Sequence, residues 1–212
     1  MNSPYIPVTP TSDNLSLSHA RKALRQQMRR ARRALSPQRQ RQAGIELRNR
    51  IRHQLWFRQA RHIGLYLPND GEIDPTPLIR LCWQLKKQVY LPVLHPIRHN
   101  RLWFLPYTRQ TRMQCNRFRI PEPALKRHPR RPAWALDLVM LPLVAFDADG
   151  NRMGMGGGFY DRTFSYKLAQ QGIRGARLVG LAHDFQKVDA LPIQPWDVPL
   201  FGIVTDRACY MR

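Results

Sequence analysis

Hydrophobic residues recur at helical spacing in the first part of the chain. One face of a predicted helix, from about residue 18 to residue 35, carries Leu24, Met28, Ala31 and Leu35. Ser36-Pro37 then provides an N-cap and a proline suited to the first helical position. The stripe of the second predicted helix consists of Ala43, Leu47, Ile51 and Leu55. The chain therefore begins with two amphipathic helices.

After these helices the pattern changes to strands that alternate with helices. Short apolar runs predict strands at 61–67, 88–94, 102–107, 136–146, 177–182 and 201–205. Apolar residues at helical spacing predict helices at 75–86 and 160–171. The run 102–107 alternates in polarity and is expected nearer an edge, a hairpin turn is expected at 147–150, and 108–134 is expected to be a long loop over the site. This alternation is typical of an α/β fold with a mainly parallel sheet covered on both faces.

The length of 212 residues suits one domain, predicted to span 18–212, and the first 17 residues, rich in Pro, Ser and Thr, are expected to be a disordered tail. No apolar run approaches the roughly 18 residues of a membrane span, and the amino-terminal residues do not resemble a secretory signal. Three widely spaced cysteines suit reduced thiols. We therefore expect a cytoplasmic protein without a membrane partner.

The formal net charge of +21 is large for a chain of this size. Residues 21–61 hold thirteen arginines and one lysine but a single acid, Glu46. Such an excess suits nucleic acid or anionic small molecules as partners, and charge alone does not choose between them. A basic nucleic-acid-binding protein remains an alternative, although no base-stacking signature is present.

Four glycines occur within the five residues 154–158, between a predicted buried strand and a predicted helix. Glycine permits positive φ and close approach of a ligand to the backbone, so backbone N–H groups of such a loop can surround phosphate oxygens. A tight strand-to-helix turn explains the same pattern. The loop matches neither the common P-loop nor the full dinucleotide-binding motif, so the glycines alone do not decide between these interpretations.

A longer segment around these glycines resembles a known family. Residues 141–161 (LPLVAFDADGNRMGMGGGFYD) are similar to the signature of the 5-formyltetrahydrofolate cyclo-ligases. Three further segments resemble the same family in the same order, namely 21–25 (RKALR), 66–74 (YLPNDGEID) and 191–200 (LPIQPWDVPL). Four motifs in register make this a specific resemblance.

The resemblance implies a three-layer α/β/α fold and an ATP- and Mg²⁺-dependent cyclisation of 5-formyltetrahydrofolate to 5,10-methenyltetrahydrofolate. ATP would phosphorylate the formyl oxygen, N10 of the folate would attack the formyl carbon, and ADP and phosphate would be released. Phosphoryl transfer of this kind requires positioning of the reactants and neutralisation of their charge rather than a protein nucleophile. Whether the folate carries a polyglutamate tail stays open, as does an ATP-dependent ligase of the same fold with another substrate.

The resemblance also implies roles for individual residues. The ATP-binding set is Arg21, Arg25, Arg152, Met153, Gly154, Met155, Gly156, Gly157, Gly158, Phe159 and Tyr160. The folate-binding set is Leu67, Glu72, Met155, Gly156, Gly157, Gly158 and Phe159. The carboxylates of Asp161 and Asp197 are expected to help hold Mg²⁺, which commonly takes one or two carboxylates beside phosphate oxygens and waters.

The same residue types also have structural interpretations. An acid such as Asp161 in a first helical turn often compensates helix charge, and Asp197 could cap a loop. A loop acid such as Glu72 is commonly exposed. Most of the thirteen arginines at 21–61 are interpreted as a solvated basic face, and Arg29 and Arg32 continue the helical stripe of Arg21 and Arg25. The chain also departs from the family pattern at Arg21, where lysine is frequent, and at Met155 and Gly157, where basic residues are frequent.

Overall fold

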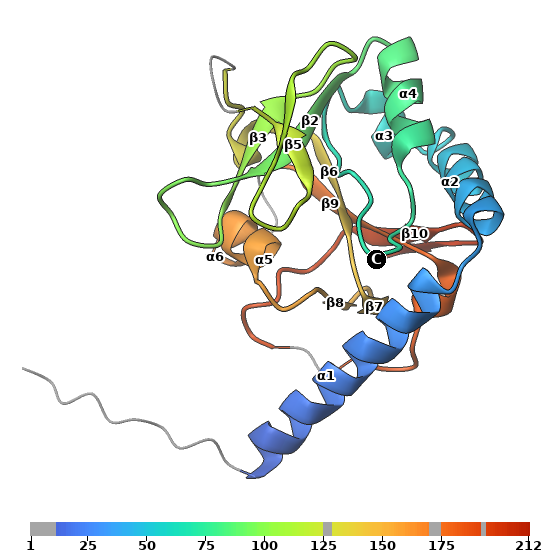
Figure 1. The fold of residues 1–212 in the computed structure, drawn as a ribbon, viewed down its shortest axis with the longest axis vertical. Helices are drawn as coiled ribbons and strands as arrows, with labels where there is room; N and C mark the ends of the chain where they lie inside the picture. Colours follow the sequence, from blue (N-terminus) through green and yellow to red (C-terminus); the bar gives the residue numbers. More distant parts are fainter. Residues whose placement is uncertain (1–11, 125–128, 170–174, 192–193) are drawn as a thin grey trace, which may run out of the picture.

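Seven strands form one mixed sheet at the centre of the protein (Figure 1). This computed structural model describes residues 12–124, 129–169, 175–191 and 194–212. In spatial order the strands are β11 (Cys209–Met211), β10 (Gly202–Thr205), β9 (Arg177–Ala182), β6 (Leu138–Pro142), β1 (His62–Gly64), β2 (Gln88–Leu94) and β3 (Leu102–Pro106). The five inner strands are parallel, and the two edge strands β3 and β11 pair antiparallel. The prediction of a mainly parallel sheet with 102–107 near an edge is confirmed.

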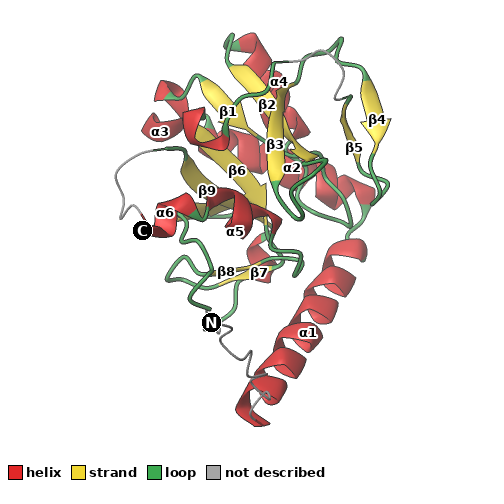
Figure 2. Cartoon of the chain, turned by 90° about the vertical axis from the view of Figure 1, so that its left-hand side faces the viewer, coloured by secondary structure: helices red, strands yellow, loops and turns green. Residues whose placement is uncertain are grey.

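Helices cover both faces of this sheet. One face carries α2 (Pro37–Ile51), α3 (Leu55–Gln59) and α4 (Thr76–Gln84). The other carries the short helices α5 (Phe159–Phe164) and α6 (Tyr166–Ala169), as the side view in Figure 2 also shows. The three-layer α/β/α architecture is therefore confirmed.

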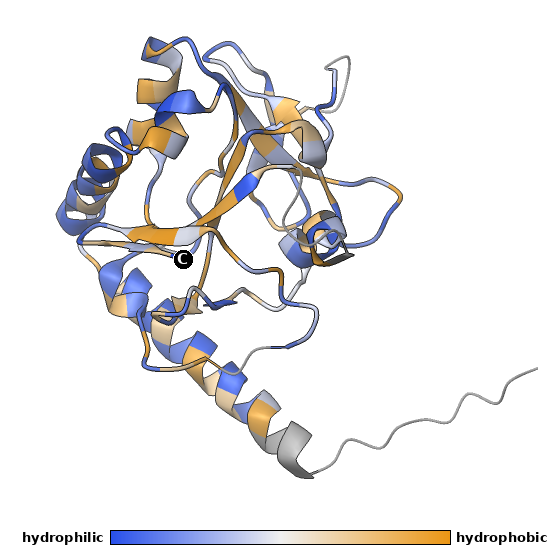
Figure 3. Ribbon diagram, turned by 180° about the vertical axis from the view of Figure 1, so that it is seen from behind, coloured by the Kyte–Doolittle hydropathy of each residue, from blue (hydrophilic) through white to orange (hydrophobic). Residues whose placement is uncertain are grey.

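Alternate residues of the strands supply the two cores between these layers. On β6, Leu138 and Met140 belong to the cluster under α2 and α4, whereas Val139 and Leu141 belong to the cluster under α5. All four are at most 1% exposed. Because successive strand residues point to opposite faces, an inner strand buried on both sides reads as a continuous apolar run. Figure 3 shows the contrast between these hydrophobic strands and the largely hydrophilic α2.

The first helix, α1 (Ser12–Arg33), extends beyond the body of the fold and packs on a small hairpin (Figure 1). Met28 of α1 joins Val144 and Met153 in a third apolar cluster. The helix begins six residues earlier than predicted, because no proline or glycine interrupts residues 11–36. The part of the predicted tail before residue 12 lies outside the described residues.

The predicted strand 136–146 is divided in the structure. It consists of β6 and the separate strand β7 (Ala145–Phe146), which pairs antiparallel with β8 (Arg152–Met153). The turn between them is built on Asp147, whose Oδ1 accepts hydrogen bonds from the N–H groups of Asp149 and Asn151 at 3.1 and 3.0 Å. The predicted hairpin turn at 147–150 is thus confirmed, and an Asp side chain that mimics a backbone turn explains it.

The described residues of the segment 108–134, which exclude 125–128, form more regular structure than the predicted loop. They contain a hairpin of β4 (Met113–Cys115) and β5 (Pro121–Pro123) and a 3-10 turn, η1 (Ala133–Ala135). Oδ1 of Asn116 accepts hydrogen bonds from the N–H groups of Phe118 and Ile120, and buried Glu122 accepts one from Leu94 N–H. These polar side chains organise a hairpin that has little hydrophobic periodicity, so the sequence pattern missed it.

Two helix predictions also need correction. Leu55 does not continue the stripe of α2, because the chain turns after Ile51 and Leu55 begins α3 with 64% of its surface exposed. The predicted helix 160–171 divides into α5 and α6 at Ser165, whose hydroxyl donates to Arg162 O and competes with the helical bonding pattern. Residues 170 and 171 lie outside the described residues. A second 3-10 turn, η2 (Asp184–Gln186), follows β9.

Candidate nucleotide and folate site

The glycine loop leads from β8 to α5 and takes backbone conformations that favour glycine. Gly156 has φ +95° and Gly158 has φ +64°, both in the left-handed region. A Cβ atom on Gly156 would lie 3.8 Å from the Arg25 guanidinium carbon, so a cationic side chain stands beside the exposed backbone. The loop therefore combines an accessible backbone with a neighbouring positive charge.

Arg25 of α1 reaches this loop, and Arg21 lies one turn before it on the same helix. Arg25 Nε donates to Gly154 O at 3.0 Å, across 129 residues of sequence. Burial lowers the pKa of Arg25, and the positive charge of neighbouring Arg21 lowers it further. Like charges held together in a partly buried place are stabilised by an anion, and a phosphate group supplies several acceptor oxygens. The structure thus brings Arg25 to the glycine loop and Arg21 to the side of Arg25, and the binding of phosphate by the two arginines stays a prediction.

Asp161 and Asp197 are brought to the same place from different segments. Oδ1 of Asp161 pairs with Arg152, whose side chain is 5% exposed, and accepts a hydrogen bond from Val198 N–H at 3.2 Å. Oδ2 of Asp197 lies 4.0 Å from Arg21 Nη2 and accepts a hydrogen bond from Gln194 N–H at 2.9 Å. Each carboxylate therefore faces an arginine at the rim of the glycine loop.

This donor set fits a Mg²⁺ ion that is held mainly by nucleotide phosphates. Mg²⁺ in phosphate sites commonly takes one or two carboxylates and fills its other positions with phosphate oxygens and waters. The contacts of Asp161 use its Oδ1 and those of Asp197 use its Oδ2. Over the described ranges no group of three or more His, Cys, Asp or Glu side chains is arranged to hold a metal without such phosphates.

Glu72 follows β1 at the carboxyl end of the parallel sheet, where ligands of open α/β folds gather. Its Oε2 accepts a hydrogen bond from Asn69 N–H at 3.1 Å. Burial raises the pKa of Glu72 to about 7, against the opposing effect of the Arg32 guanidinium. Burial also raises the pKa of the Tyr160 hydroxyl, and the Glu72 carboxylate raises it further. The acid is thus half-buried and close enough to Tyr160 of α5 for its charge to affect that hydroxyl, rather than freely exposed.

An aromatic residue that the sequence did not single out lies over the loop. Phe118, at the tip of the β4–β5 hairpin, meets Phe159 edge to face with 5.9 Å between ring centroids. The Arg117 guanidinium lies 4.9 Å from the Phe118 ring centroid, and half of Phe118 remains exposed. In the sequence, Phe118 is a single aromatic residue between two arginines, so its contact with Phe159 could not be predicted without knowledge of the hairpin.

The other predicted site residues have different surroundings. Met153 is 1% exposed and packs in the α1 cluster, so its side chain faces the core rather than the loop. Met155 is 49% exposed. Tyr160 stacks on Phe164 at 6.5 Å, and Leu67 packs partly buried against the core under α2.

The basic face predicted along α1 is in part a buried contact. Asp70 pairs with Arg29, Arg32 and Arg33, and the side chain of Arg32 is fully buried. Arg32 Nη1 also donates to Leu143 O at 3.2 Å. Burial alone would raise the pKa of Asp70, but hydrogen bonds from Arg29 and Arg33 outweigh it, and the pKa is lowered. Arg32 is therefore a buried exception to the predicted solvated face, Arg29 keeps 36% of its side chain exposed, and both arginines dock the Glu72 loop on α1.

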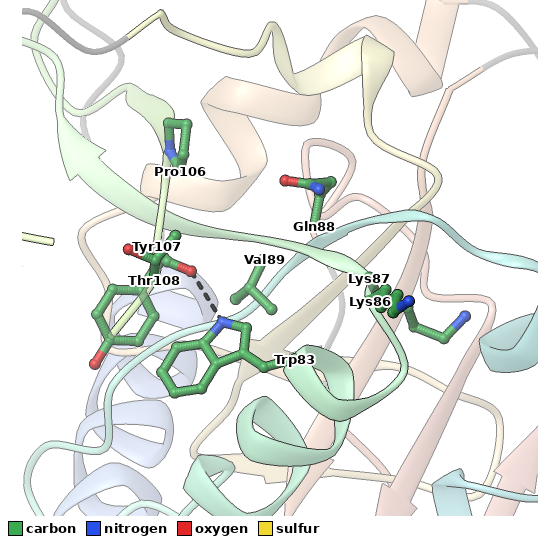
Figure 4. A pocket seen from close by; sticks show the side chains of 8 residues that line it. All are labelled: Trp83, Lys86, Lys87, Gln88, Val89, Pro106, Tyr107 and Thr108. Atoms are coloured by element: carbon green, nitrogen blue, oxygen red, sulfur yellow. Dashed lines mark hydrogen bonds between the residues drawn. The ribbon is translucent and has the colours of Figure 1, made fainter. Parts of the chain in front are cut away.

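A hollow lies at the opposite end of the sheet from Glu72 and the glycine loop. Figure 4 shows its lining, which includes Trp83, Lys87, Gln88 and Tyr107. The indole N–H of Trp83 donates to Tyr107 O at 3.0 Å and closes one wall. Gln88 begins β2, so this hollow is at the amino end of a parallel strand, away from Glu72 and the glycine loop. None of the predicted site residues lines it.

Comparison with known proteins finds a matching family model and relatives that carry the same name as that family. The 5-formyltetrahydrofolate cyclo-ligase family model matches residues 17–206. A 5-formyltetrahydrofolate cyclo-ligase of Escherichia coli (strain K12) is 42% identical over 84% of this chain and 96% of its own length. That of Haemophilus influenzae is 44% identical over 87% of this chain and 96% of its own length.

Solved structures agree with the fold. The NMR structure of Aquifex aeolicus 5,10-methenyltetrahydrofolate synthetase superposes with a TM-score of 0.75 at 27% identity, over 90% of this chain and 92% of that one. In the part of the chain that is described, no helix has the length and apolar character needed to cross a membrane.

Proposed function

This chain belongs to the 5-formyltetrahydrofolate cyclo-ligase family, and we propose that it converts 5-formyltetrahydrofolate to 5,10-methenyltetrahydrofolate at the expense of ATP. The observation that carries the ATP dependence is the contact of Arg25 with the glycine loop, with the charge of Arg21 beside it. Arg25 and Gly154 are 129 positions apart in sequence, yet Arg25 Nε is 3.0 Å from Gly154 O. Cationic side chains over an open backbone suit the phosphates of a nucleotide.

The proposed reaction begins with transfer of the γ-phosphoryl group of ATP to the formyl oxygen. This transfer breaks the bond between that group and ADP, and it makes the formyl carbon electrophilic. N10 of the folate then attacks that carbon, the carbon–oxygen bond breaks, and inorganic phosphate leaves with the former formyl oxygen. Loss of the N10 proton yields the methenyl product.

The chain's own contribution is positioning and charge neutralisation, which are the main requirements of phosphoryl transfer. Arg21 and Arg25 would bind the phosphates. Mg²⁺, when bound, would supply charge neutralisation at the phosphate oxygens, and Asp161 and Asp197 are the carboxylates that would hold it. The attacking nitrogen belongs to the substrate, so no covalent intermediate with the enzyme is required.

Glu72 and Phe118 would form the folate side of the site. The Glu72 carboxylate is proposed to accept hydrogen bonds from N–H groups of the folate, because an ionised carboxylate only accepts. Phe118 and Phe159 present ring edges and faces to the same region, which suits the flat pterin. Leu67 lines the approach. A cytoplasmic location, where ATP is abundant, is part of this proposal.

A direct assay tests the function. The protein is mixed with 5-formyltetrahydrofolate, ATP and Mg²⁺, and the absorbance of the methenyl product is followed. We expect product only when nucleotide is present, with ADP and phosphate released in equal amounts. Product at full rate without any nucleotide contradicts the ATP dependence. Nucleotide-dependent turnover of a different substrate, with none of 5-formyltetrahydrofolate, supports a ligase of the same fold with another specificity.

A further inference from the structure

The cationic groups around the glycine loop differ in whether their charge is already compensated. The loop has no charged side chain of its own between Arg152 and Asp161. The Arg152 guanidinium is buried and paired with Asp161, so its charge is largely neutralised within the protein. Arg152 therefore acts mainly to hold Asp161 in place, and the charge that faces a ligand has to come from elsewhere.

Arg162 occupies the position next to the loop backbone. Its Nη1 donates to Gly157 O at 2.7 Å, and a Cβ atom on Gly158 would lie 2.6 Å from the same nitrogen. The side chain thus folds back over the Gly157–Gly158 peptide. Over the described residues, no carboxylate lies within 4.0 Å of its guanidinium nitrogens, whereas Arg152 and Arg21 each have one.

The geometry of Gly157 explains why this charge comes from α5 and not from the loop. A Cβ atom on Gly157 would lie 2.7 Å from the Phe159 ring, so the ring occupies the space that a side chain at position 157 would enter. The Arg162 guanidinium instead lies beside the next residue, where a Cβ atom on Gly158 would meet its Nη1. Because its carbonyl contact uses one of five N–H donors, the remaining donors are available to a ligand.

We propose that Arg162 is a phosphate-binding residue that works with Arg25 across the glycine loop. Arg25 stands beside Gly154 and Gly156, and Arg162 stands beside Gly157 and Gly158, so the two guanidiniums flank successive parts of one exposed backbone. An anion resting on that backbone meets a cation on each side. The ligand class is a polyphosphate, and its identification as ATP rests on the proposed function.

Binding measurements on Arg162 variants test this role. Calorimetry is used to compare the wild type with Arg162→Ala and Arg162→Lys, using Mg·ADP, inorganic tripolyphosphate and 5-formyltetrahydrofolate as separate ligands. Loss of a charge-assisted contact is expected to weaken Mg·ADP and tripolyphosphate by about tenfold or more in Arg162→Ala. Arg162→Lys should recover part of that loss, because lysine keeps the charge without the flat fork. Folate binding should change less than twofold.

Arg131→Ala provides the matched control. Arg131 Nε also donates to a nearby backbone carbonyl, that of Ala135 at 2.9 Å, but at the start of the segment leading to β6. Its Mg·ADP affinity should stay within twofold of wild type. Equal Mg·ADP and tripolyphosphate affinities in the wild type and Arg162→Ala overturn the proposal, as does a parallel loss of folate binding and thermal stability. A wild type that binds folate but neither phosphate ligand overturns the nucleotide site itself.

Discussion

Val198 donates its backbone N–H to Oδ1 of Asp161 at 3.2 Å, and this bond holds the segment that carries Asp197 against the first turn of α5. Two carboxylates that are 36 positions apart in the chain therefore meet at the glycine loop. Because Asp161 also neutralises buried Arg152, its removal would disturb both the fold and the proposed metal position. Asp197 is the better probe of Mg²⁺ binding, because its ion pair with Arg21 is 4.0 Å long and therefore looser than the pair of Asp161 with buried Arg152.

For Asp197→Asn we predict a higher Mg²⁺ requirement and a lower maximal rate. The amide retains the size of the side chain but loses the negative charge that attracts the ion. The melting temperature without nucleotide should remain nearly unchanged, since the ion pair with Arg21 is 4.0 Å long and the amide oxygen of Asn can still accept the hydrogen bond from Gln194 N–H. An unchanged Mg²⁺ titration together with a lower melting temperature assigns Asp197 a purely structural role.

Gly156→Val should abolish nucleotide binding while the fold persists. A β-branched residue at φ +95° is strained by about 1–2 kcal/mol, and its side chain would project toward Arg25, where the phosphates are proposed to lie. Gly150→Val is the matched control, because Gly150 has φ +80° and a Cβ atom there would meet only Arg212 Cδ, at 3.9 Å. Similar Mg·ADP affinities of the two variants, measured by calorimetry, would mean that the glycine loop is only a turn.

Glu72→Gln should impair folate use more than ATP use, because the amide lacks the anionic acceptor. The pKa of about 7 adds a pH test. In the wild type the carboxylate forms as pH rises through about 7, so the KM for 5-formyltetrahydrofolate should fall over that range. In Glu72→Gln this part of the pH profile should disappear. A change confined to the KM for ATP would place Glu72 on the nucleotide side of the site and contradict its proposed contact with folate.

The Glu72 carboxyl group should favour folate binding as pH rises but lower the stability of the fold over the same range. Its folded pKa is raised above the ordinary value of 4.5, so its contribution is fully present below that value and is lost as pH rises through about 7. The free energy of unfolding of the wild type, relative to Glu72→Gln, should therefore decrease between about pH 4.5 and pH 7. Urea unfolding at several pH values measures this difference.

Arg32→Ala should destabilise the fold by about 3 kcal/mol, the cost of removing one partner of a buried ion pair. Arg32 is fully buried and contacts both Asp70 and Leu143 O. Arg30→Ala, an exposed position on the same helix, should change stability by less than about 0.5 kcal/mol. Equal unfolding free energies for the two variants, from urea titrations, would contradict the docking role of Arg32.

The pattern of hydrophobic residues was sufficient to predict the parallel sheet. Strands β6 and β9 are buried on both faces, so nearly all of their residues are apolar. The motifs also predicted which segments meet, as the contact of Arg25 with Gly154 illustrates. The β4–β5 hairpin was missed because polar side chains, those of Asn116 and Glu122, organise it. Burial of Arg32 was missed because its partner, Asp70, is 38 positions away in the sequence. Helical spacing shows which residues share a face of α1, but it does not show which arginine on that face meets a distant carboxylate.

Transfer of the formyl oxygen to phosphate is the central claim of the proposed mechanism, and isotope labelling tests it most directly. 5-Formyltetrahydrofolate labelled with ¹⁸O in the formyl group is turned over with unlabelled ATP and Mg²⁺, and the released phosphate is analysed by mass spectrometry. The proposed mechanism predicts one ¹⁸O atom in each inorganic phosphate, with ADP unlabelled. Unlabelled phosphate released in step with methenyl product would show that the formyl oxygen leaves by another route, and would contradict the mechanism.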